Sequence, residues 1–259
     1  MVTGLVRRVG VAVGLPVVLV VVWWFASAGS TDFYFPPLRR IVEVFPETWF
    51  GPRLADDVLP SLGRLAVGYL AALVLGVGLG MLIGSSRTLR ALVEPLLEFL
   101  RAVPPPVLVP ILVLVAGIGN TMKVLVIISG CLWPVLLNTV EGVRAVDEVL
   151  ADTCRTYRIR GRLRWWHLVL RSASPQIVTG ARQALSVGII LMVISEMFAA
   201  SSGLGYTVIQ FKDGFQIPQM WSGVILLGLL GVLLSVVFRL AEYRVLGWYH
   251  GSRAVAKER

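Results

Sequence analysis

The stretch ADTCRTYRIRGRLRWWHLVLRSASP, residues 151–175, decides how the chain is organised, because it is a basic island in an otherwise apolar sequence. It holds six arginines and one acidic residue, Asp152. Apolar segments of about the length that spans a bilayer lie on both sides of it. A charged segment between two membrane spans must lie in water, so the island predicts an aqueous loop of a membrane protein.

Composition supports this prediction, since 56% of the 259 residues are hydrophobic and 15% are charged. A soluble domain is nearer to about 25% charged residues. The pattern predicts an all-α membrane protein with six transmembrane helices, at residues 1–28, 62–84, 103–116, 122–137, 176–200 and 221–241. The first apolar run has an alternative interpretation, a cleaved signal peptide, because Ala26-Ser27-Ala28 resembles a cleavage site.

Polar or amphipathic segments connect the spans. Residues 31–60 predict a polar loop with one short helix around 41–49, residues 85–101 an amphipathic connection, and residues 201–219 an outer loop. The third span begins with Pro104, Pro105 and Pro106, followed by Pro110. Proline lacks the amide hydrogen, so this start must be extended or broken, which a membrane tolerates only beside protein or a hydrated cavity.

Positive charge indicates the sidedness of the chain. With the N-terminus inside, the inner segments carry 18 Lys and Arg residues and the outer loops carry four. This excess predicts a multi-pass protein of the plasma (inner) membrane, with both termini and the island in the cytoplasm. The net charge of +9 follows sidedness rather than one face, so we expect no nucleic-acid partner. Cys131 and Cys154 fall at different membrane levels, which predicts neither a disulfide nor a metal site.

No catalytic residues and no phosphate-binding G-x-x-x-x-G-K-[ST] loop are apparent, so the sequence predicts no enzyme activity. Active transport would then draw on an ion gradient or on another subunit. The one clear ionisable residue inside a span is Glu196. It has two interpretations: it lines the path or a gate, or it has a structural role and is hydrogen-bonded to outer-loop backbone. The candidates for the path or gate are Pro104, Pro105, Pro106, Pro110, Glu196, Ser201 and Ser202.

The island itself predicts two short helices that turn at Gly161. Its apolar positions have the spacing of a packing helical stripe, and its arginines fall on other faces: the stripe is Leu163, Trp166, His167 and Leu170. Exposed arginines and tryptophans are typical of protein interfaces. A solvated face that touches anionic lipid headgroups explains the same pattern. From the pattern alone, both alternatives stay open.

Residues 138–206 resemble the permease subunits of ATP-binding cassette (ABC) importers, in particular the nitrate/sulfonate/taurine type. Asp152-Thr153-Cys154 stands where that family has Glu-Ala-Ala, and Arg155 and Pro175 keep the expected spacing. Arg158 takes the usual glycine position and Gly161 follows it, so we expect the turn to be shifted or opened. The segments RAVPPPVLVPILVLVAGIG, LWPVLLNTVEGVRAVD and SEMFAASSGLGY also resemble this subfamily.

The resemblance implies a type I importer permease fold with a cytoplasmic coupling helix and no catalysis of its own. It implies a second permease copy, ATPase subunits that bind ATP and Mg, and an extracytoplasmic solute-binding protein. The residues implied to contact the ATPase are Asp152, Cys154, Arg155, Arg158, Arg160, Gly161, Arg164 and Trp166. The solute would be a small anion, such as a sulfonate, nitrate or organic acid, or a vitamin precursor. The alternative is an ion-coupled secondary transporter that acts without an ATPase.

These observations predict that the chain has three regions. Residues 1–60 form the N-terminal helix and extracytoplasmic loop, residues 61–241 the permease core with its coupling loop at about 141–175, and residues 242–259 the cytoplasmic tail.

Overall fold

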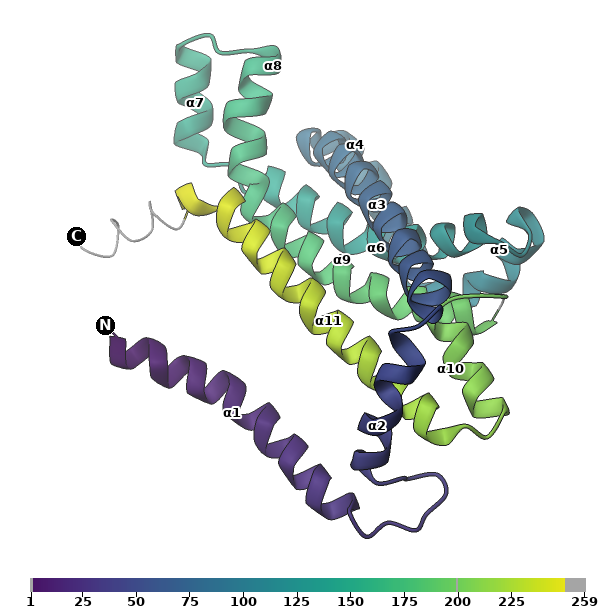
Figure 1. Ribbon diagram of the computed structural model, residues 1–259. Coiled ribbons are helices and arrows are strands. Elements are labelled where there is room, and N and C mark those ends of the chain that lie inside the picture. The colour runs from purple at the N-terminus through teal and green to yellow at the C-terminus, as the bar shows by residue number, and fades with distance from the viewer. Residues whose placement is uncertain (1, 199, 250–259) are drawn as a thin grey trace.

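The computed structural model describes residues 2–198 and 200–249, with side chains from residue 14 onward (Figure 1). Every regular element in this part of the chain is helical. The six longest helices are α1 (Val2–Ser27), α3 (Leu59–Ser85), α4 (Arg87–Arg101), α6 (Asn120–Arg144), α9 (Leu170–Phe198) and α11 (Ile217–Val245). The shorter elements are α2 (Leu38–Trp49), the π-helix η1 (Leu54–Val58), the 3₁₀ turn η2 (Pro105–Leu108), α5 (Val109–Ala116), α7 (Glu148–Thr156), α8 (Gly161–Arg164), the π-helix η3 (Trp165–Val169) and α10 (Leu204–Asp213).

The core is built from α3, α6 and α9, which pack side by side. On α3, Gly68, Gly76, Gly80 and Gly84 repeat along one face. A Cβ placed at Gly76 would lie 2.7 Å from Val135 Cγ1 of α6, and one at Gly80 would lie 2.6 Å from Thr139 Cβ. The glycines therefore let the two helix backbones approach closely, as small residues do in membranes.

The remaining long helices lie outside this core. Helix α11 runs along α9, and an ion pair between Arg182 and Glu242 joins them. Helix α1 lies apart from the core in Figure 1, and it meets the rest at α2 and at Trp23, whose ring packs edge to face on Trp221. Most of the described side chains of α1 are exposed, as expected of a helix that faces lipid.

The proline-rich segment breaks the chain where the sequence predicted. The helical segments 87–101 and 105–116 meet at an angle of 81°. The prediction of a third span at 103–116 is wrong in its extent, because α5 has only eight residues. A helix of that length rises about 12 Å, well short of about 30 Å of hydrocarbon. A crossing here requires α4 and α5 together, as one broken span or a re-entrant loop.

In the described part of the chain, four helices are long and apolar enough to cross a membrane, or five if the bent pair counts as one span. The four are 54–85, 120–144, 161–198 and 217–245. Of α1, the part with described side chains, Gly14–Ser27, is apolar and by itself shorter than a span. The protein is thus an all-helical membrane protein, and its sixth span stays a prediction.

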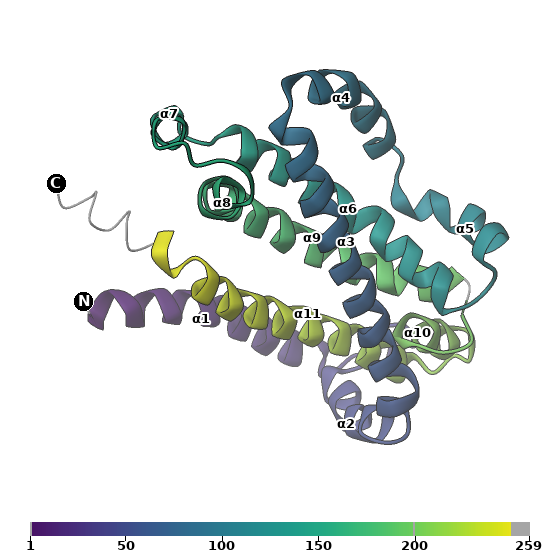
Figure 2. The same ribbon diagram turned by 90° about the horizontal axis from the view of Figure 1, so that it is seen from above.

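Two other expectations change. Residues 201–219 were expected to be a loop, and they contain α10, which packs on α9 and α11. The island was expected to be separate from the fifth span, yet α8, η3 and α9 continue one into the next over residues 161–198. Helices α7 and α8 project from the body as an arm, at the opposite end from α2 and α10 (Figures 1 and 2).

Candidate functional site

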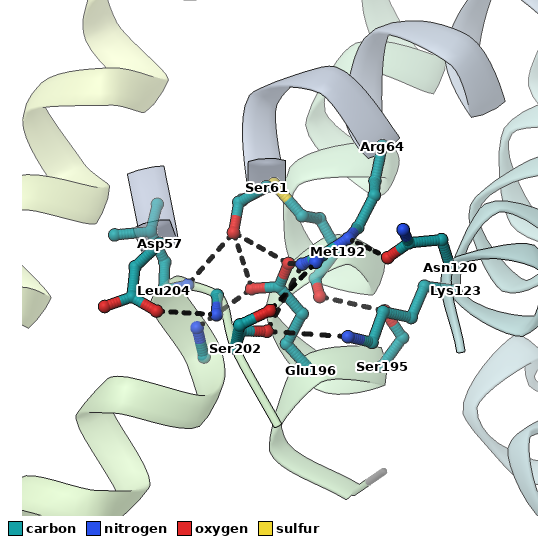
Figure 3. Close-up of polar contacts among 12 residues, drawn as sticks. Asp57, Ser61, Arg64, Asn120, Lys123, Met192, Ser195, Glu196, Ser202 and Leu204 are labelled. Carbon is teal, nitrogen blue, oxygen red and sulfur yellow. Dashed lines mark hydrogen bonds and ion pairs between the residues drawn. The ribbon is translucent and has the colours of Figure 1, made fainter. Parts of the chain in front are cut away.

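A buried charged cluster joins α3, α6 and α9 where they meet the chain leading into α10 (Figure 3). Its centre is Glu196, whose side chain is 0% exposed. Glu196 Oε1 accepts from Arg64 Nη1 at 2.6 Å and from Ser61 Oγ at 2.7 Å. Its Oε2 accepts from the backbone N–H of Gly205 at 3.1 Å. The buried carboxylate thus has both an opposite charge and hydrogen bonds, which a buried charge requires.

The face of α3 that points at this cluster is set by sequence spacing. Asp57, Ser61 and Arg64 are four and three residues apart, so they lie on one side of a helix. Asp57 Oδ1 accepts from the Gly203 N–H at 2.9 Å, and Ser61 Oγ accepts from the Leu204 N–H at 3.0 Å. Asp57 belongs to the π-helix η1, an element often found at functional sites. One helix face therefore fixes the backbone that enters α10.

Gly203 is required at this position for two reasons. Its φ of +121° lies where residues with a side chain are strained. A Cβ there would also lie 2.5 Å from Glu196 Cδ. The backbone of Gly203 consequently packs directly on the carboxylate.

Two positively charged side chains donate hydrogen bonds to Ser202. Arg64 donates from Nη1 to the Ser202 carbonyl oxygen at 3.3 Å and from Nη2 to Ser202 Oγ at 3.2 Å. Lys123 Nζ donates to the same carbonyl oxygen at 3.4 Å. Arg64 Nε also donates to Asn120 Oδ1 at 2.8 Å. Arg64 is 7% exposed and Lys123 is 3% exposed, so both charges are buried.

The structure brings together only part of the predicted path. Glu196 and Ser202 both belong to the cluster, while Ser201 is exposed and makes none of the contacts described above. The prolines lie elsewhere: Pro105 Cγ would be 3.2 Å from a Cβ on Gly130, two turns along α6 from Lys123. In the described part of the chain, none of Pro104, Pro105, Pro106 and Pro110 forms a hydrogen bond with a residue of the cluster. The structural interpretation of Glu196 predicted a hydrogen bond to backbone of residues 201–219, and the Gly205 N–H donates such a bond to Oε2.

Sequence reasoning missed the main partners of Glu196. Its carboxylate bonds to Arg64 and Ser61, and neither residue was linked to it. Asp57 and Lys123, which bond to the backbone of Gly203 and Ser202 beside it, were not placed there either. The available signal was the spacing of Asp57, Ser61 and Arg64, because three polar residues on one face of an apolar helix require polar partners.

The arm is the second candidate site. Helix α7 ends in a Schellman turn: the Ile159 N–H donates to the Cys154 carbonyl at 2.8 Å, and the Arg158 N–H donates to the Arg155 carbonyl at 3.1 Å. Arg158 has a φ of +55°. The expectation of a shifted turn is therefore wrong, since Arg158 adopts the left-handed conformation at the position where glycine is usual. Gly161, with a φ of +58°, allows a second turn before α8.

Most of the arm surface is open to solvent. Exposed residues include Asp152, Arg155, Arg158, Arg160, Gly161, Arg164 and Trp166. Cys154 is half-buried and lines a groove of about 540 Å³ between α7, α8, η3 and Trp248. The prediction of a packing stripe is wrong in register, because Leu168 and Val169 are the buried residues and Trp166 is 56% exposed. The π-helix η3 adds a residue to the turn, which rotates the following side chains.

Neither site has the residues of a metal centre. No group of three or more His, Cys, Asp or Glu side chains that could hold a metal ion occurs among residues 2–198 and 200–249.

Comparison with known proteins gives the same fold. Residues 72–246 match the family described as "Binding-protein-dependent transport system inner membrane component". The taurine transport system permease protein TauC of Escherichia coli K12 is 28% identical over 94% of this chain and 91% of its own. The putative aliphatic sulfonates transport permease protein SsuC of the same strain is 31% identical, over 91% and 92%. A chain of the inward-facing MetNI methionine ABC transporter superposes with a TM-score of 0.64 at 18% identity, over 73% of this chain and 94% of that one.

Proposed function

Because this chain belongs to the family of binding-protein-dependent transport system inner membrane components, we propose that it forms the translocation pathway for a small solute that is an oxyanion or carries a sulfonate group. The family makes it a multi-pass inner-membrane ABC transporter permease, a transmembrane subunit without catalysis whose ATPase is a separate subunit. The proposed solutes are sulfonates, including taurine, and nitrate. The observation that carries this proposal is the match to a taurine permease over 94% of the chain.

The proposed assembly has two permease copies, two ATPase subunits and an extracytoplasmic binding protein. The arm is the proposed ATPase dock, because it projects from the helix body and exposes arginines and Trp166. The buried charged cluster lies at the opposite end, with α2 and α10, where the binding protein would deliver solute. In this arrangement α1 is the first of six spans, both termini are cytoplasmic, and residues 61–241 are the permease core.

The alternative of an ion-coupled carrier loses its main support. It depended on Glu196 as an ion-coupling carboxylate inside a span. Glu196 is paired with Arg64 at 2.6 Å and also accepts hydrogen bonds from the Ser61 hydroxyl and the Gly205 N–H. We assign it a structural role, in which it joins α9 to α3 and α10. We therefore assign the energy source to the separate ATPase.

The test is uptake by the reconstituted system. The permease, the ATPase and the binding protein encoded beside it are expressed in a bacterium without its own sulfonate and nitrate importers, and uptake of labelled taurine, ethanesulfonate and nitrate is measured. We expect uptake of at least one of these solutes, and its loss when the ATPase carries an inactivating change in its phosphate loop. Uptake that persists with the inactive ATPase would instead favour the ion-coupled carrier.

A further inference from the structure

Two buried cations use the oxygen atoms of a single neutral residue. Arg64 and Lys123 together direct three donors at Ser202, over distances of 3.2–3.4 Å (Figure 3). The bond from Arg64 to Glu196 is 2.6 Å, and charge-assisted N–H···O⁻ bonds are typically about 2.7–2.9 Å. The oxygens of Ser202 are therefore distant, weak ligands for the charges that face them.

Lys123 is the less satisfied of the two cations. Its side chain is 3% exposed, and in the described part of the chain no carboxylate lies within 4.0 Å of Nζ. An ammonium group carries three donors, and the one hydrogen bond made by Nζ is 3.4 Å long. A buried charge with so few partners is costly, which indicates a missing ligand at this position.

The charges of the cluster point to a single negative charge as that ligand. The buried cations Arg64 and Lys123 face the buried anions Glu196 and Asp57, and Asp57 also pairs at 3.8 Å with Arg53, whose side chain is 40% exposed. Glu196 is thus paired with Arg64 and Asp57 with Arg53. One positive charge is in excess. The carboxylate of Glu196 already accepts from Arg64, Ser61 and Gly205, so it leaves Lys123 without a counter-ion.

The start of α6 favours an anion at the same place. Lys123 lies in the first turn of this 25-residue helix, and no side chain caps the helix start. Free backbone N–H groups and the helix dipole attract negative charge there. Asn120, Thr121 and Ser201 are exposed, so this cluster lies just below the surface.

We propose that the place held by the oxygens of Ser202 is a binding site for one singly charged oxyanion, with Lys123 and Arg64 as its ligands. Without the anion, the carbonyl and hydroxyl oxygens of Ser202 accept the hydrogen bonds of Arg64 and Lys123, and both oxygens move away when the anion binds. Leu204 stays held by Ser61, so the movement is confined to the peptide between Ser202 and Gly203, and turning this peptide also releases the Gly203 N–H from Asp57 Oδ1. The proposal rests on the proposed function. The site would bind nitrate, or the sulfonate group of the solute, at the outer end of the translocation pathway.

The first test is anion binding by the purified full-length protein in detergent. Ethanesulfonate is the probe, and ethyl methyl sulfone, similar in shape and uncharged, is its control. We expect ethanesulfonate, but not the sulfone, to raise the midpoint of thermal unfolding. Lys123→Met should abolish this shift, and without ligand it should not lower the midpoint, because it removes a poorly paired buried charge. Lys212→Met, an exposed lysine of α10, should leave the shift unchanged.

Two results would overturn the site: an ethanesulfonate shift that survives Lys123→Met, or an equal shift with the sulfone. A fall in the ligand-free midpoint of Lys123→Met would make Lys123 a structural tie to Ser202, which also contradicts the proposal. The second test is uptake by the assembled transporter, where Lys123→Met should reduce the rate at least tenfold at saturating binding protein and Lys123→Arg should keep about a third of it. Normal uptake by Lys123→Met refutes the site alone, whereas no uptake by the wild type refutes the proposed function.

Discussion

Arg64 and Glu196 lie 132 residues apart in the chain and form a buried ion pair, with Nη1 of the arginine 2.6 Å from Oε1 of the glutamate. The pair joins α3 to α9 beside the backbone that enters α10. Removing one member of such a pair leaves the other charge buried without its counter-ion. The stability of this end of the molecule should therefore depend on both residues together.

We expect Arg64→Met and Glu196→Gln each to destabilise the protein by about 3–5 kcal/mol, because each leaves a buried charge unpaired. The double variant should cost less than the sum of the two, since it leaves neither charge. Glu196→Gln keeps the shape of the side chain, so the expected loss is due to the missing charge opposite the Arg64 guanidinium. Thermal unfolding and the yield of monodisperse protein in detergent measure the effect.

The matched control is the exposed pair Arg39 and Glu43 on α2, whose side chains are 78% and 58% exposed. Arg39→Met and Glu43→Gln should each cost under about 0.5 kcal/mol, as surface pairs of this spacing do. Equal losses for the exposed and the buried pairs would show that the cluster around Glu196 is not specially stabilised.

Gly203→Ala should destabilise the same region. The backbone conformation alone costs about 1–3 kcal/mol for a residue with a side chain. In addition, the new Cβ would meet the Glu196 carboxyl group at 2.5 Å, so the carboxylate must move away from Arg64. The measurement is again the unfolding midpoint, with Gly228→Ala on the open face of α11 as control. Nothing lies within 4 Å of a Cβ at Gly228, so that variant should lose no stability.

The positions of α1, α3, α6, α9 and α11 could be predicted from the sequence because each contains a long apolar run, which is a local property. The break at Pro104–Pro106 was predictable for the same reason, since a missing amide is a local property. The partners of Glu196 were not, because the contact between Arg64 and Glu196 exists only once α3 and α9 are packed. Helix α10 was missed because it is short and lies in a mixed polar segment, where tertiary contacts with α9 and α11 decide the structure.

Arg158→Gly should stabilise the arm. Arg158 holds a left-handed conformation that costs an ordinary residue about 1–2 kcal/mol relative to the right-handed one, and glycine is largely free of that cost. Hydrogen exchange at the Ile159 N–H, which is bonded to the Cys154 carbonyl, should become slower. Arg160→Gly is the control, because Arg160 has a φ of −129° and gains nothing from glycine. Faster exchange in Arg158→Gly would mean that the arginine side chain itself stabilises the turn.

Charge reversal of the arm tests its role as the proposed ATPase dock. Arg160→Glu with Arg164→Glu should reduce co-purification of the ATPase at least tenfold, or leave the complex intact with ATP hydrolysis uncoupled from transport. Reversed charges add repulsion as well as losing attraction. The control is Arg87→Glu with Arg90→Glu on α4, another basic helix predicted to lie on the cytoplasmic side. If the arm touches only lipid headgroups, the arm variant should bind the ATPase normally and lose affinity for anionic vesicles. Normal transport and normal complex yield in the arm variant would exclude this surface as the dock.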